Sequence, residues 1–143
     1  MNPVNPLSVS SYSQIAAIGL SGMAAAQTRL QSSASNLANM QDQAPLPRSG
    51  VAGPAPYVPT QVVTVSLSGG GVAAQSKPVA PAYSAGYAPG SPYADGKGMV
   101  ATPNVDLASN LVDQAMSMVQ FRASLAAVQA ADDMEKTVLN IKA

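Results

Sequence analysis

Cysteine, histidine and tryptophan are absent from this chain of 143 residues. Without cysteine there are no disulfides and no thiolate metal sites, and without histidine there are no imidazole ligands and no Ser–His or Cys–His catalysis. Charged residues make up 10% of the chain, with seven Lys+Arg and seven Asp+Glu, whereas typical soluble domains are roughly a quarter charged. The zero net charge argues against nucleic-acid binding, and the weakly charged surface favours association. The composition indicates an assembly component rather than an enzyme, with no cofactor.

Large apolar side chains are also scarce. Hydrophobic residues make up 47% of the sequence but aromatic residues only 4%, and alanine supplies much of the difference, so a self-sufficient core is hard to build. The apolar stretch Ile15–Ala26 resembles a secretion signal, but no Lys or Arg precedes it, and such signals begin with a positively charged region. It is also too short for a membrane-spanning helix. We therefore expect neither a cleaved Sec signal nor a membrane span.

Proline and glycine divide the chain into three segments, 1–43, 44–101 and 102–143. The middle segment holds nine of the 12 prolines and nine of the 11 glycines. The two outer segments carry helical patterns. This distribution predicts an irregular or β-rich insert between two helices.

The first segment predicts a helix over about Tyr12–Met40, with Ser11 and Gln14 spaced as a capping box. Its apolar residues recur about every 3.5 positions, the period of a coiled-coil seam. We call this set, with its counterpart in the last segment, the apolar ladder. In the first helix the main ladder positions are Leu20, Met23, Leu30 and Leu37.

The last segment predicts a longer helix over about Val105–Ile141, with Asn104 as its cap and Asp106 in the first turn, where the helix dipole favours an anion. The ladder has the same spacing here. Its main positions are Leu111, Met118, Phe121, Leu125 and Val128. A helix of this length is longer than any core the chain can wrap around it, so another surface must cover the excess.

The middle segment has strand character over residues 58–79. β-Branched residues lie on both sides of Gly69–Gly71, which predicts a β-hairpin. Residues 80–99, rich in Tyr, Gly, Pro and Ser, are expected to form an irregular extended arm. The expected fold class is mainly α with a small β insert: long N- and C-terminal helices form an antiparallel coiled-coil-like pair, and a hairpin and irregular segment lie between them.

No chemical constellation is evident in the sequence. Asp132, Asp133 and Glu135 form the one acidic cluster, but two adjacent residues point about 100° apart on a helix, so a solvated helix face is favoured over a metal site. Gly69–Gly71 lacks the Lys-Ser/Thr of a phosphate loop, and Asp95–Gly98 is typical of a tight turn. The pattern favours a subunit whose non-closing contacts generate a filament or tube.

Two motifs resemble the bacterial flagellar axial proteins. The first is Ser21-Gly22-Met23-x-Ala25-x-Gln27-x-Arg29-Leu30, followed by Ser35-Asn36-Leu37-Ala38-Asn39. The second is Pro103-Asn104-Val105-Asp106-Leu107, followed by Leu111-Val112, Phe121-x-Ala123, Ala130-Ala131-Asp132 and Met134. This order of terminal motifs is similar to the basal-body rod protein family. The stretch Pro89–Asp95, continuing through Gly98-Met99-Val100, is similar to the short proximal-rod members.

The resemblance implies a structural rod subunit, exported by the flagellar type III apparatus to the periplasmic rod. Its partners would be copies of itself, other rod proteins, the membrane-ring and export-gate base, and the distal rod. The ladder residues would pack helix on helix, and Asn36, Asn39, Asn104 and Asp106 would make polar contacts at helix ends or between subunits. The alternative is a secreted binding or adaptor module that uses the tyrosine-rich arm over residues 80–99. Tyr57, Tyr83, Tyr87 and Tyr93 could stack on nucleic-acid bases, but contacts between subunits are favoured for them.

Overall fold

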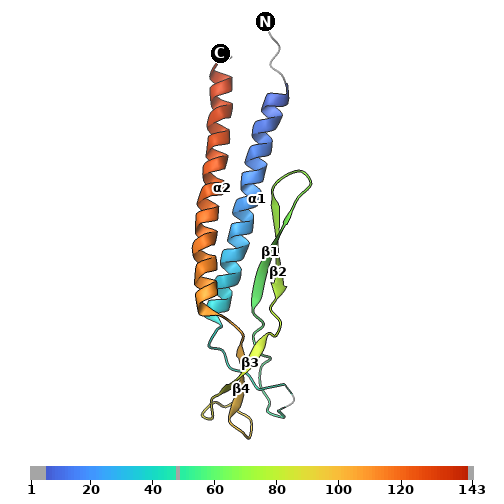
Figure 1. Cartoon of the computed structure of the whole chain (residues 1–143), viewed down its shortest axis with the longest axis vertical. Helices are drawn as coiled ribbons and strands as arrows, with labels where there is room; N and C mark the ends of the chain where they lie inside the picture. The colour runs from blue at the N-terminus through green and yellow to red at the C-terminus, as the bar shows by residue number, and fades with distance from the viewer. Residues whose placement is uncertain (1–5, 48, 142–143) are drawn as a thin grey trace.

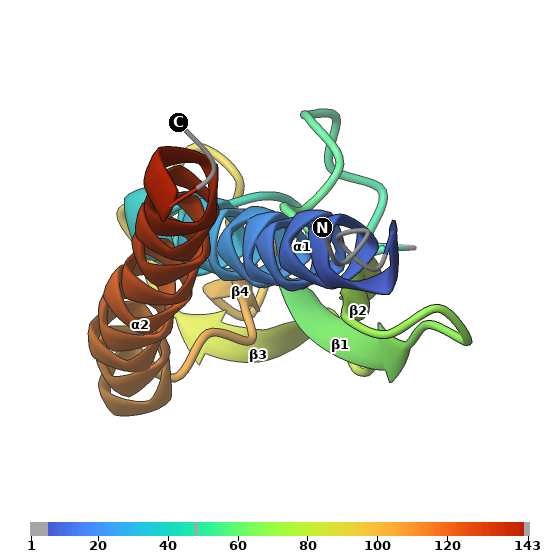
Figure 2. The same cartoon turned by 90° about the horizontal axis from the view of Figure 1, so that it is seen from above.

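The computed structural model describes residues 6–47 and 49–141. The elements are two helices and four strands: α1 (Pro6–Ala38), β1 (Thr60–Ser66), β2 (Val72–Pro78), β3 (Tyr83–Tyr87), β4 (Met99–Pro103) and α2 (Leu107–Ile141). The molecule is elongated, and the two helices run in opposite directions along it (Figure 1). Seen from above, α1 has α2 on one side and the β1–β2 pair on another (Figure 2). The shape leaves most of both helices at the surface.

Both helices begin at residues other than those expected. α1 begins at Pro6, where the fixed φ of proline suits a first helical turn. The predicted capping box at Ser11 is therefore wrong, and Gln14 donates instead to the carbonyl of Gly69 at 3.3 Å. The cap of α2 is Asp106, whose Oδ1 accepts from the Ser109 backbone N–H at 2.6 Å. A cap must directly precede the first helical residue, which rules out Asn104.

β1 and β2 form an antiparallel pair in which Thr60 lies opposite Pro78 and Ser66 opposite Val72. The glycine turn between them follows the surface of α1. Gly71 has a φ of +84° and lies against Ser21, and the Ser21 hydroxyl accepts from the Val72 backbone N–H at 3.1 Å. Glycine supplies both the positive φ and the space for this close approach.

The expected irregular arm over residues 80–99 is a wrong prediction. β3 and β4 form a second antiparallel pair, with Tyr83 opposite Pro103 and Tyr87 opposite Met99. Ala44, after α1, bridges to Ala101 through two backbone hydrogen bonds of 3.1 and 2.8 Å. Both strands are five residues long, too short for an alternating pattern to stand out against the surrounding Gly and Pro.

The predicted fold class must therefore be corrected. The fold is two helices with two separate two-stranded antiparallel sheets, not a coiled-coil-like helix pair with one hairpin and an irregular segment between its members. The apolar ladder does not form a seam between the helices. The buried residues of the two helices are small or polar: Gly19, Gly22, Ala25, Ala26, Ser33, Asn36, Ser117 and Ala131.

Glycine explains why the helices meet on this other face. A Cβ on Gly19 would lie 2.5 Å from Val128 Cγ2 and 3.1 Å from the Ser124 carbonyl oxygen. The two backbones therefore approach more closely at this level than side chains would allow. The small face of each helix turns inward, and the large apolar residues are left on the outside.

Candidate subunit interface

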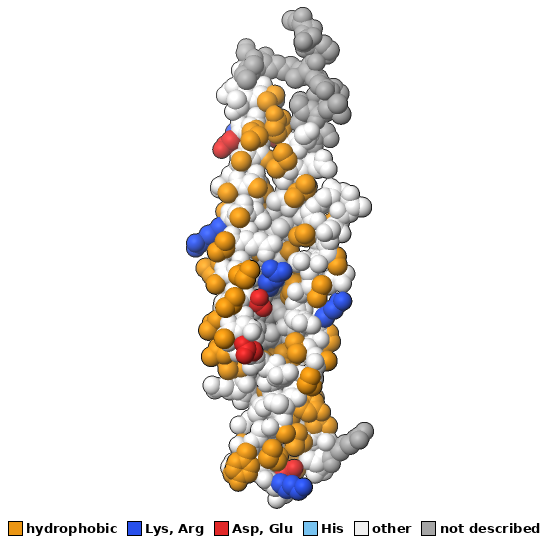
Figure 3. All heavy atoms as spheres, in the orientation of Figure 1, with side chains coloured by type: hydrophobic (Ala, Val, Ile, Leu, Met, Phe, Trp, Pro, Cys, Tyr) orange, Lys and Arg blue, Asp and Glu red, His pale blue; other side chains and the backbone are white. Residues whose placement is uncertain are grey.

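Most of the predicted packing residues are at the surface. Among the ladder residues that are exposed, the exposed fraction of the residue runs from 36% for Leu30 to 55% for Leu20. The exposed members are Leu20, Leu30, Leu111, Met118, Phe121 and Leu125, and the half-buried members are Met23, Leu37 and Val128. Val128 lies against α1, beside Gly19. Apolar side chains are spread along the face seen in Figure 3, where charged side chains are few.

The structure brings three ladder residues from the two helices together. Leu30 of α1 and Met118 and Phe121 of α2 line an apolar groove of 370 Å³. We call it the inter-helix groove, and its lining residues are Ala26, Gln27, Leu30, Ser117, Met118, Phe121 and Arg122. The groove carries one charge, Arg122, at its rim.

A second apolar surface on α2 was missed at the level of sequence. Val112, Met116 and Val119 are 56%, 61% and 67% exposed, the highest values for large apolar side chains in the described helices. Their spacing of four and three residues places them in one stripe, which we call the α2 ridge. The same spacing is visible in the sequence, but the apolar ladder lies on another face of α2 and does not include these residues.

The amount of exposed surface is large for the size of the chain. Its accessible surface is 9228 Å², whereas a compact monomer of 14.4 kDa exposes roughly 6,800 Å². The excess of about 2,400 Å² reflects the elongated shape and small core, and it is larger than the roughly 800 Å² that each partner loses in a standard interface. One dimer contact would not cover it.

Asn36 is the centre of a polar network that joins three elements. Its side chain is 4% exposed. Nδ2 donates to the Thr60 carbonyl at 2.7 Å and to Asn110 Oδ1 at 3.0 Å. Oδ1 accepts from the Thr60 N–H at 3.0 Å and from the Tyr57 hydroxyl at 3.2 Å. Asn36 of α1 thus holds the base of the β1–β2 hairpin and the start of α2.

The other three motif residues also bond within the chain. Asn39 Nδ2 donates to the Ser35 carbonyl at 2.8 Å, at the end of α1. Asn104 Nδ2 donates to the Pro81 carbonyl at 3.0 Å. The pKa of Asp106 lies below its ordinary value because its carboxylate accepts hydrogen bonds from the Ser109 backbone N–H and hydroxyl. All three retain exposed or half-exposed surface.

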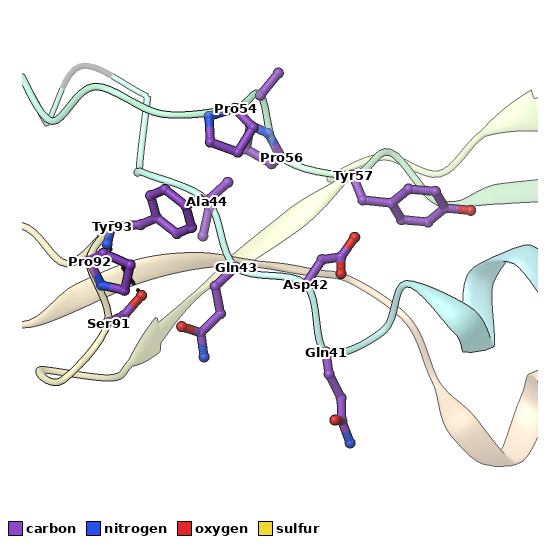
Figure 4. A pocket seen from close by; sticks show the side chains of 12 residues that line it. Gln41, Asp42, Gln43, Ala44, Pro54, Pro56, Tyr57, Ser91, Pro92 and Tyr93 are labelled. Atoms are coloured by element: carbon purple, nitrogen blue, oxygen red, sulfur yellow. Dashed lines mark hydrogen bonds between the residues drawn. The ribbon is translucent and has the colours of Figure 1, made fainter.

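An open pocket of 660 Å³ lies at the sheet end of the molecule. In Figure 4, Pro54 and Pro56 face it from one side and Pro92 and Tyr93 from another. Tyr57 lines it as well, whereas Tyr83 and Tyr87 lie in β3 and are not among its lining residues. The tyrosines therefore do not gather into one surface. The lining of the pocket holds a single carboxylate, Asp42.

The remaining polar clusters have local partners. Asp132 forms an exposed ion pair with Lys136, one turn away, which raises the pKa of Lys136. Asp95 Oδ1 accepts from the Lys97 and Met99 N–H groups at 2.8 and 2.9 Å, and these bonds lower the pKa of Asp95. Asp95–Gly98 is a tight turn, as predicted, closed by a 2.9 Å bond from the Gly98 N–H to the Asp95 carbonyl.

Neither a membrane span nor a metal cluster is found where the structure is described. No helix within residues 6–141, residue 48 aside, is long and apolar enough to cross a membrane. The same residues contain no group of three or more His, Cys, Asp or Glu side chains arranged to hold a metal ion.

Exposed apolar helix faces over a small core are typical of a subunit that packs against further subunits. Residues 97–141 match the family model described as "Flagellar basal body rod FlgEFG protein C-terminal". The matched segment contains β4, α2, the α2 ridge and the α2 side of the inter-helix groove. No curated protein matches the chain. The match supports a component of the flagellar basal-body rod, and that family is structural, not enzymatic.

Proposed function

We propose that this chain is a structural subunit of the bacterial flagellar basal-body rod, in the position of the proximal-rod protein FlgC. In this role it polymerises with its own copies and with other rod proteins into a helical tube. The tube transmits motor torque and surrounds the export channel. The subunit reaches the periplasmic rod through the flagellar type III apparatus, and its neighbours are the membrane-ring and export-gate base and the distal rod.

The observation that carries the proposal is the inverted polarity of the helices. Each buries a small set of glycine, alanine, serine and asparagine residues against the rest of the chain and leaves most of its large ladder residues at the surface. Burial of apolar surface is the main favourable term in protein association. A chain that exposes about 2,400 Å² more than a compact monomer can recover this term by contacting several neighbours, as a tube subunit does.

The match over residues 97–141 gives the proposal its biological setting. FlgC and the proximal position rest on the stretch from Pro89 to Val100, which resembles the short rod members. In this setting Asn39, Asn104 and Asp106, which keep exposed surface, make polar contacts between subunits in addition to their bonds within the chain.

A deletion strain tests the role in motility. Loss of the gene should abolish swimming and remove the rod from isolated basal bodies. Leu125→Asp should do the same, because Leu125 is 37% exposed in the single chain and a charge there becomes buried and unpaired only on assembly. Gln75→Glu, on the exposed face of β2, adds a charge away from the helices and should leave swimming intact. Normal swimming of the deletion strain would refute the proposal.

The pocket at the sheet end favours a second candidate, a secreted module that binds an extended peptide. Tyr57, Tyr93 and three prolines line that pocket, and such surfaces suit proline-rich chains. This function predicts that the deletion strain swims normally and that the protein is absent from basal bodies. The same strain therefore separates the two candidates.

A further inference from the structure

The α2 ridge and the inter-helix groove are two distinct apolar surfaces of one chain. The ridge is Val112, Met116 and Val119, and the α2 side of the groove is formed by Ser117, Met118, Phe121 and Arg122. At 100° per residue, the centres of the two sets are ~150° apart around the helix. A single chain therefore cannot place its own ridge in its own groove.

The two surfaces lie at the same level along α2, since residues 112–119 and 117–122 overlap. The ridge runs over residues 112–119, and its first and last members are ~10 Å apart along the helix axis. The groove of 370 Å³ is open and lies between two helices, the arrangement that receives a ridge of side chains from a third helix. Two chains placed side by side, with a shift of ~6 Å along their length, bring ridge and groove together.

We propose that the α2 ridge of one copy fills the inter-helix groove of the next copy. The inference rests on the proposed function and names the contact that propagates the assembly. Each copy offers a ridge on one side and a groove on the other, so the contact is heterologous. Repetition of a heterologous contact gives a ring or an open helical filament rather than a dimer.

Charge and area favour a second copy as the occupant. The ridge contains no charged residue, and the groove contains only Arg122, so a strongly acidic or basic partner has no complement there. A symmetric dimer would cover one surface and leave the other exposed. The chain's excess surface is larger than one standard interface would cover, which agrees with more than one contact for each copy.

Cross-linking of the full chain tests this geometry, since the sequence has no cysteine and any introduced thiol is unique. Met116→Cys places a thiol on the ridge, and Leu30→Cys places one in the groove. Oxidation of a concentrated mixture of the two variants should give disulfide-linked dimers that contain one copy of each variant. Each variant alone should give at least tenfold less dimer. A chain that carries both Met116→Cys and Leu30→Cys should give a series of oligomers of increasing size. A chain that carries both Met116→Cys and Gln75→Cys should not.

Circular dichroism of each variant establishes that it folds, and a charge variant gives an independent measurement. Met116→Glu should abolish oligomer formation by the otherwise unchanged chain in sedimentation, whereas Gln75→Glu should have no effect. Efficient dimers of Met116→Cys with itself would overturn the proposal, because they indicate a symmetric contact. A mixture that cross-links no better than the Gln75 control would overturn it too.

The outcomes separate this contact from the proposed function. If the cross-links fail but the deletion strain loses its rod, the flagellar role stands and the ridge–groove contact is wrong. If the series of cross-linked oligomers forms but the deletion strain swims normally, the ridge–groove contact stands and the flagellar role is wrong.

Discussion

Substitution of Gly19 by alanine should destabilise the chain even though alanine is the better helix former. In an open helix interior this change stabilises by about 1 kcal/mol. Here the new Cβ would lie 2.5 Å from Val128 Cγ2 and 3.1 Å from the Ser124 carbonyl oxygen. One obstacle is backbone and the other is a β-branched side chain with restricted χ1. Overpacking of this kind costs about 1–3 kcal/mol, so we expect a net loss of about 1 kcal/mol.

Gly22→Ala is the matched control. Its Cβ would lie 2.5 Å from Ser124 Oγ, an atom that rotation about χ1 moves away, so most of the propensity gain of about 1 kcal/mol is retained. Urea unfolding followed by far-UV circular dichroism measures both changes. Val128→Ala in the Gly19→Ala background should recover most of the loss, with a coupling of about 1 kcal/mol. If Gly19→Ala stabilises as much as Gly22→Ala, the helices do not meet at this face.

Three further predictions concern the polar network, the turn and the exposed ladder. Asn36→Ala leaves buried partners in β1 and α2 unpaired and should cost about 2 kcal/mol, with faster amide exchange in β1; unchanged exchange there would contradict the network. Asp95 has a lowered pKa, so its stabilisation of the β3–β4 turn is present above the ordinary Asp pKa and is lost as the pH falls through the lowered value. Amide shifts of that turn should move below about pH 4, and Asp95→Asn should remove the transition. Leu111→Gln, at a side chain that is 50% exposed, should change the free energy of unfolding by less than about 0.5 kcal/mol; a loss of several kcal/mol would mean that Leu111 is packed within the single chain.

The positions of the regular elements were more accessible to sequence reasoning than the faces on which they pack. The heptad-like period located both helices within a few residues of their observed ends, apart from the start of α1. The β-branched residues on either side of Gly69–Gly71 located β1 and β2. These features depend on local preferences, which a single chain records directly.

The face on which α1 and α2 meet could not be derived from the period of the apolar residues. The small face that α1 presents to α2, with Gly19 and Gly22, is one position away from the ladder at Leu20 and Met23. A shift of one residue turns a helix by about 100°, which separates the contact face from the free face. Glycine and serine give little hydropathy signal. They allow another helix to approach closely, and the sequence does not show which helix approaches.

β3, β4 and the role of Asn36 could not be derived from local pattern either. β4 exists because Met99–Pro103 pairs with β3 and, at Ala101, with Ala44 from a distant part of the chain. The motif around Asn36 predicts that this residue makes polar contacts, but it does not predict which groups it contacts. Its four hydrogen bonds depend on the tertiary arrangement of α1, β1 and α2.

The central claim is that the exposed apolar helix faces are covered by neighbouring subunits. Thiol labelling of Leu125→Cys, compared between the purified chain and intact basal bodies isolated from cells that swim with this variant, tests it directly. We expect Leu125→Cys to be labelled rapidly in the purified chain and at least tenfold more slowly in basal bodies. Gln75→Cys, the reference position on the hairpin, should be labelled rapidly in the purified chain. Equal labelling rates for Leu125→Cys in the two states would contradict the account.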